Sequence, residues 1–144
     1  MLVPPDALVR KTARDGTPGA RFAQLAGEHD ALLHHVGARV EALVGEKDRW
    51  PAQELRRLID CLQQEVLRQV EREEQVIFPA ASPSEVVQLA RDHVRLRVGA
   101  QALELAAAGE GSQSAEQLRA HARGLLLLLQ RHLETERRVF TQRP

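Results

Sequence analysis

The sequence predicts an all-α protein: an up-down-up-down antiparallel four-helix bundle with a short N-terminal arm. Glycine and proline divide the chain into four long segments, and in each segment apolar residues recur at helical spacing. The composition agrees, because Leu, Ala, Glu, Arg and Gln are frequent and favour helices. The connections between segments span roughly four to six residues, and such short connections favour antiparallel neighbours.

Capping residues and helix breakers mark the ends of the segments. The clearest signal is Ser82-Pro83-Ser84-Glu85, a capping box with proline at the first helical position. Residues 1–17 show no helical period, so we assign them to an arm and residues 18–144 to one bundle domain. The expected helices run from Pro18 to Val44 before Gly45, from Asp48 or Pro51 to Pro79, from Ser82 to Gly109, and from Ser112 or Ser114 to about Phe140.

Charge and cysteine content exclude several classes of protein. Lys and Arg together number 20, as do Asp and Glu, so a net charge of zero argues against broad binding to nucleic acid or to a membrane. Cys61 is the only cysteine, which excludes an internal disulfide and a thiolate metal cluster. The N-terminus lacks an apolar signal core, and no apolar run approaches the ~20 residues of a membrane span. We expect a cytoplasmic protein.

Six polar residues interrupt the apolar stripes of the four helices. Burying an ionised glutamate without a partner costs several kcal/mol, so six such residues need a common explanation. In an antiparallel bundle all six lie at one level, near one end. Imidazoles and carboxylates that converge in a bundle core are typical of a metal site, and two bridging carboxylates allow two ions. The six residues are His29, Gln69, Glu73, His93, His132 and Glu136.

The two halves of the chain repeat this pattern. His29 and Gln69 are 40 residues apart, and His93 and His132 are 39 apart. Gln69 and His132 are each followed four residues later by a glutamate on the same helical face. The repeat predicts a pair of similar helical hairpins.

The order of these motifs resembles that of the hemerythrin-like, HHE cation-binding domain family over residues 18–141. The motifs are EHDALL at 28–33, EREEQVIFP at 71–79, DHVRL at 92–96 and HLETE at 132–136. The resemblance implies a four-helix bundle around a non-haem di-iron centre. It also implies iron ligands at His29, His93 and His132, with Glu73 and Glu136 as bridging carboxylates.

Two positions depart from the family pattern. Gln69 stands where the HxxxE motif has a histidine, and Arg97 stands where oxygen-carrying hemerythrins have a further histidine. The resemblance assigns His93 and His132 to one iron, and His29 with position 69 to the other. We therefore predict one tight metal and a weak or empty second position. Gln69 is either a weak ligand through its carbonyl oxygen or a buried amide bonded to a neighbouring His or Glu.

The predicted function is that of a non-haem iron protein that binds or senses dioxygen, nitric oxide or peroxide. An enzyme is less favoured, because no separate acid, base or nucleophile constellation is visible. The alternatives are an iron-handling, peroxide-reactive protein and a metal-free interaction module. In the metal-free case Glu73 and Glu136 would form buried ion pairs or lie at solvated helix ends.

Some residues near the stripes receive other interpretations. We expect His34 and His35 on the surface and His121 at another level of the bundle. Leu126 and Leu127 are expected to point away from the core. They predict either a homo-oligomer contact or a surface covered by residues 1–17, and the alternative is an ordinary buried helix turn.

Overall fold

The computed structural model describes residues 18–109 and 113–141, and the predicted arm at residues 1–17 lies outside this range. All regular structure within the described residues is helical. In chain order the elements are α2 (Pro18–Gly45), α3 (Ala52–Cys61), the π-helical turn η1 (Leu62–Val66), α4 (Leu67–Val76), the 3-10 turn η2 (Phe78–Ala80), α5 (Pro83–Ala107) and α6 (Ala115–Thr141).

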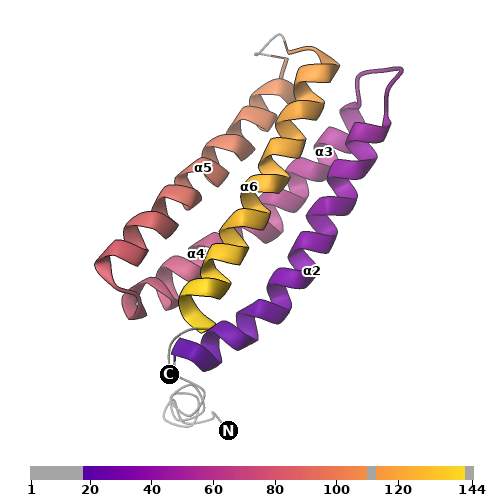
Figure 1. Cartoon of the computed structure of the whole chain (residues 1–144). Helices are drawn as coiled ribbons and strands as arrows, with labels where there is room; N and C mark the ends of the chain where they lie inside the picture. Colours follow the sequence, from indigo (N-terminus) through magenta and orange to yellow (C-terminus); the bar gives the residue numbers. More distant parts are fainter. Residues whose placement is uncertain (1–17, 110–112, 142–144) are drawn as a thin grey trace, which may run out of the picture.

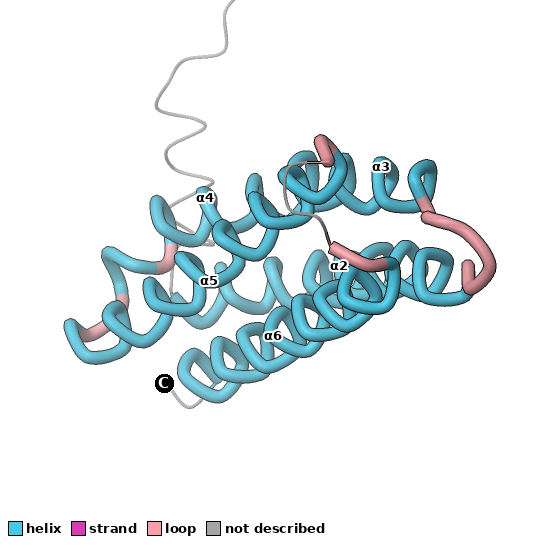
Figure 2. The backbone as a smooth tube through the Cα atoms, turned by 90° about the horizontal axis from the view of Figure 1, so that it is seen from above, coloured by secondary structure: helices cyan, strands magenta, loops and turns pink. Residues whose placement is uncertain are grey.

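The elements form four long helical segments, because α3, η1 and α4 follow one another without a break. Helix α6 packs against α2 and α5, and α3 packs against the same two helices. In Figure 1 the beginnings of α2 and α5 lie at the same end of the molecule as the ends of α4 and α6. Figure 2 shows the same helices from above. The described chain is all-helical and consistent with a helical bundle.

Side-chain caps fix where two of the helices begin. At α5 the Glu85 amide donates to Ser82 Oγ at 3.3 Å, and the Ser82 amide donates to Glu85 Oε1 at 2.8 Å. At α6 the Gln117 amide donates to Ser114 Oγ, and the Ser114 amide donates to Gln117 Oε1. Reciprocal bonds of this kind satisfy amides that have no partner within the helix.

The main core lies between the four helical segments and consists chiefly of leucine and valine. In α2 and α6 the most buried positions differ by one residue from those that a simple helical period predicts. Leu32 and Leu129 are buried, whereas the neighbouring Leu33 and Leu128 are half-buried. A helix with two neighbours buries a band wider than one row, so flanking residues share the contact. Leu126 is also half-buried against this core, contrary to expectation, whereas Leu127 is 52% exposed. The oligomer contact stays a prediction.

The π-helical turn η1 was not predicted. Leu62 and Val66 at its ends are both buried, so the widened turn keeps the helix on the core while shifting its phase. Gln69 and Glu73 follow in α4, and both are buried. The turn therefore lies directly before the two residues that α4 contributes to the polar cluster.

Within residues 18–109 and 113–141, no helix is both long and apolar enough to cross a membrane.

Cys61 illustrates how burial controls reactivity in this core. Its thiol donates to Glu65 Oε2 at 3.0 Å, and burial together with Glu65 raises the pKa of the thiol to about 12. Because the thiolate is the nucleophile, we expect iodoacetamide at pH 8 to alkylate Cys61 far more slowly in the folded protein than after unfolding in urea. Mass spectrometry of timed samples measures both rates. Equal rates would show that the thiol is accessible and ionisable in the native state.

Candidate metal centre

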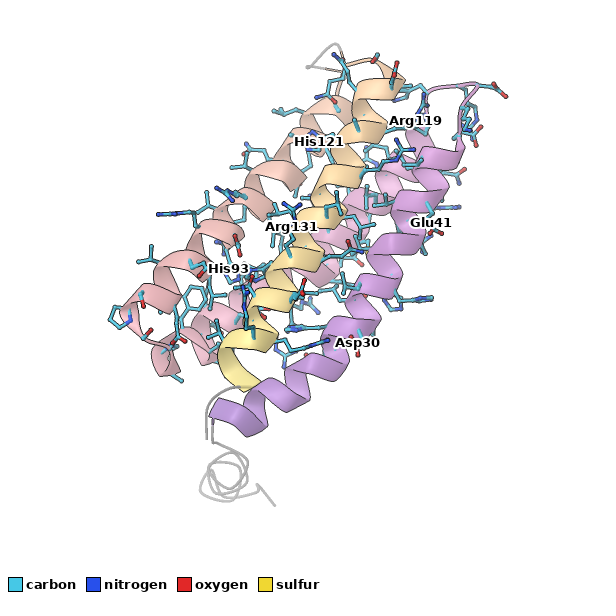
Figure 3. All side chains as sticks on the ribbon, in the orientation of Figure 1. Asp30, Glu41, His93, Arg119, His121 and Arg131 are labelled. Carbon is cyan, nitrogen blue, oxygen red and sulfur yellow. The ribbon has the colours of Figure 1, made fainter. Side chains whose placement is uncertain are left out.

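The six polar residues singled out in the sequence are all buried, with exposed fractions between 0% for His93 and 8% for Gln69. They come from all four helical segments: α2 contributes His29, α4 contributes Gln69 and Glu73, α5 contributes His93, and α6 contributes His132 and Glu136. Figure 3 shows His93 in the half of the bundle where α2 begins and α6 ends.

One side of the cluster is formed around His93 and His132. Glu73 Oε2 lies 3.0 Å from His93 Nε2 and 3.3 Å from His132 Nε2. Glu136 Oε1 lies 2.7 Å from His132 Nε2, and the two Nε2 atoms are 3.1 Å apart. One donor atom from each of these four residues lies within 4.8 Å of the others. Two imidazoles and two carboxylates at this separation match the donors of a divalent first-row metal.

The other side of the cluster is formed around His29. Its Nε2 lies 3.3 Å from Glu73 Oε1 and 3.6 Å from Glu136 Oε2. Both carboxylates therefore present one oxygen to His29 and the other to the pair of histidines. Gln69 completes this side, with its amide nitrogen 3.2 Å from His29 Nε2.

Further contacts orient two of the imidazoles. His93 Nδ1 lies 3.1 Å from Glu74 Oε2, and Arg97 holds Glu74 through two hydrogen bonds. His132 Nδ1 lies 3.0 Å from Asp92 Oδ2. A carboxylate that accepts the Nδ1 proton leaves the Nε2 lone pair facing the cluster, which is the tautomer a metal needs.

Sequence reasoning assigned no role to Glu74 or Asp92, and it placed Arg97 only as a departure from the family pattern. Each carboxylate directly neighbours a predicted ligand in the chain, which was the available signal. Phe78 also escaped prediction. Its ring stacks on His93 with centroids 5.1 Å apart and covers the imidazole on its outer face.

The electrostatics of the cluster favour positive charge. Burial lowers the pKa of both His93 and His132, but Glu136 and Glu73 more than compensate and raise it to about 9 and about 10. Burial and the Glu73 carboxyl raise the pKa of Glu136. Burial opposes ionisation of Glu73 too, yet contacts with Glu136 and the three histidines hold its pKa below the usual range. Protons thus balance two buried carboxylates, and a cation that binds here displaces protons.

One further feature of the cluster suits a metal ion, and it concerns an oxygen of Glu136. Among the described side chains no donor is aligned for a hydrogen bond with Glu136 Oε1, although this oxygen is buried. His132 Nε2 is close to it, at 2.7 Å, but outside hydrogen-bond geometry. Since buried acceptors normally have a partner, an oxygen left in this way is suited to a cation.

Comparison with known proteins agrees with this geometry. The family model of the hemerythrin HHE cation-binding domain matches residues 21–143. The chain belongs to this family. Neither the curated proteins nor the solved structures that were compared give a match. The resemblance inferred from the motifs is therefore confirmed, and all six residues of the cluster lie within the range that matches the hemerythrin family.

The remaining histidines lie away from the centre of this hemerythrin-family chain. His121 Nε2 lies 3.3 Å from the Gly99 carbonyl oxygen, and Figure 3 shows it at another level from His93. His34 and His35 are exposed. Of the charged run EREE at 71–74, Glu71 and Arg72 face solvent while Glu73 is 1% exposed, so the run is not simply a solvated surface.

Proposed function

We propose that this hemerythrin-family chain is a non-haem iron protein that binds or senses a small molecule such as dioxygen, nitric oxide or peroxide. The observation that carries the proposal is the position of Glu73 and Glu136, which are buried between three imidazoles with one oxygen of each toward either side. Iron held there supplies a redox-active Lewis acid with room for an outside ligand.

Different residues would hold the two cations and exclude water from them. His93, His132, Glu73 and Glu136 would hold the first cation, and His29 with the other two carboxylate oxygens would hold a second. Two apolar clusters enclose this level: the main core on one side, and Ile77 with Leu89 on the other. These clusters exclude water, which strengthens the hold of the carboxylates on a cation.

Gln69 supports an uneven pair of positions. Its amide nitrogen forms a hydrogen bond with His29 Nε2 at 3.2 Å, so this bond occupies the atom through which His29 would bind a metal. A cation at this side must break that bond or turn the amide, and it then gains only a neutral oxygen. An amide oxygen is a poorer donor to divalent iron than imidazole. We infer a tight position at His93 and His132 and a weak one at His29.

Removal of the metal is expected to lower the melting temperature. A ligand bound only to the native state stabilises it by about 2.7 kcal/mol at a concentration 100 times its Kd. Calorimetry before and after chelation, with the metal content verified in each sample, measures the effect. A melting temperature that does not change on verified metal removal contradicts the proposal.

An interaction module is the second candidate function, and one surface feature favours it. Val87, Val94, Val98 and Leu105 are each 45% to 59% exposed and follow one face of α5 at spacings of seven, four and seven residues. Such a row is typical of a helix that packs against a partner. A chain that takes up no iron and yet associates in sedimentation experiments favours this candidate.

A further inference from the structure

A surface pocket reaches the cluster from the side of Gln69. It has a volume of about 280 Å³ and lies between α2 and the segment formed by η1 and α4. The π-helical turn places Gln64 and Glu65 in its wall. The lining residues are Glu28, Ala31, Leu32, His35, Gln64, Glu65, Arg68, Gln69 and Arg72.

The floor of this pocket is one side chain away from a proposed metal ligand. Leu32 and Gln69 line the pocket and are 7% and 8% exposed. Behind the Gln69 amide lies His29 Nε2 at 3.2 Å, and Glu73 Oε1 lies 3.3 Å beyond that nitrogen. The Gln69 side chain therefore stands between the pocket and the His29 side of the cluster.

The opposite side of the cluster is more firmly closed. His93 is covered by the stacked ring of Phe78 and by Glu74, which Arg97 holds in place. His132 is bonded to Asp92 at its outer nitrogen. Opening this side breaks charge-assisted hydrogen bonds, whereas opening the Gln69 side breaks one hydrogen bond from a neutral amide.

The pocket walls favour a small anion. Glu28 is paired with Arg72 at 3.0 Å, and Glu65 accepts hydrogen bonds from His35 and Cys61, so both carboxylates are already engaged. Arg68 pairs with none of the described side chains. Among the described residues, the wall therefore offers one guanidinium without a charged partner, that of Arg68, and amide donors from Gln64 and Gln69.

We propose that this pocket is the access route by which a small anion reaches the His29 side of the centre, with Gln69 as its gate. The proposal rests on the proposed function for the metal that the anion meets. It gives a further meaning to the glutamine at position 69, which weakens the metal position beside His29 and separates that side of the cluster from the pocket.

Cysteine labelling tests the access route in protein that contains no metal. In a Cys61→Ala background, Gln69→Cys and Val70→Cys place a thiol at neighbouring buried positions, of which only position 69 lines the pocket. Methyl methanethiosulfonate is expected to modify position 69 at least about tenfold faster than position 70, which is reached only through local opening. Circular dichroism verifies that both variants are folded. Equal labelling rates in the two folded variants overturn the route.

Azide binding to the iron-loaded chain tests it independently. Ala31→Leu fills the pocket mouth, and Ala42→Leu makes the same exposed change on α2 away from the pocket. We expect azide to associate several-fold more slowly with Ala31→Leu than with Ala42→Leu at equal iron content. Equal association rates for the two variants overturn the access route. If the natural chain contains no iron, the proposed function is overturned, and the labelling experiment alone decides whether the route exists.

The class of ligand has its own test. Arg68→Gln removes the uncommitted charge from the wall and is expected to slow azide association at low salt, while labelling of a cysteine at position 69 by the neutral reagent stays unchanged. An unchanged azide rate contradicts the assignment to anions.

Discussion

Replacing Glu73 with glutamine is expected to remove metal from both sides of the centre at once. Glu73 is 1% exposed, and its two oxygens lie against all three histidines, with Oε1 near His29 and Oε2 near His93 and His132. Glutamine preserves the volume but removes the negative charge and one acceptor oxygen. Loss of a residue that merely orients a ligand costs about 10–100-fold in metal affinity, so we expect a larger loss here.

A matched control separates this effect from a general change in α4. Glu71→Gln makes the same chemical change two residues earlier, on the exposed face of the helix. Both variants are loaded with ferrous iron, passed through a desalting column and analysed for metal. Glu71→Gln should retain the metal content of the natural chain. A Glu73→Gln protein that retains it as well would show that this carboxylate is not a ligand.

Replacing Gln69 with histidine is expected to raise the metal content from about one to about two ions per chain, because imidazole is a better donor to divalent iron than an amide oxygen. The position already faces His29 and lies one helical turn before Glu73, so the change needs no new backbone geometry. It also removes the amide hydrogen bond that occupies His29 Nε2.

Gln64→His provides the control for this second substitution. Gln64 lines the same pocket but is exposed, so a histidine there adds an imidazole without completing the buried cluster. Metal analysis of both variants, together with anomalous scattering from crystals of Gln69→His, shows the count and the position. An unchanged count in Gln69→His would contradict the view that this residue limits the second metal.

Much of the fold could be predicted because its signals are local. The capping box at Ser82 and the glycine at 109, which has a φ of +78°, define the ends of α5 in the sequence itself. The π-helical turn could not be predicted, because leucine and valine at Leu62 and Val66 fit an ordinary helix equally well. Its wider hydrogen-bond pattern depends on packing against the other helices.

The candidate site followed from the sequence for a similar reason. Helical spacing and short loops predict that the six polar residues lie at one level of the bundle. The outer contacts depend instead on side-chain rotamers, which spacing does not determine. Examples are the bond between His132 and Asp92, and the pair formed by Glu74 and Arg97. Two residues that line the pocket beside Gln69, Gln64 and Glu65, lie in the π-helical turn, which helical spacing did not predict.

Metal analysis of the natural chain, purified from cells supplied with iron, tests the central claim most directly. Elemental analysis gives the count, and anomalous scattering at the iron edge gives the position. We predict about one iron per chain, bound between His93, His132, Glu73 and Glu136, with little occupancy beside His29. A chain that takes up no metal would contradict the proposed function, and two equally occupied positions would contradict the role of Gln69.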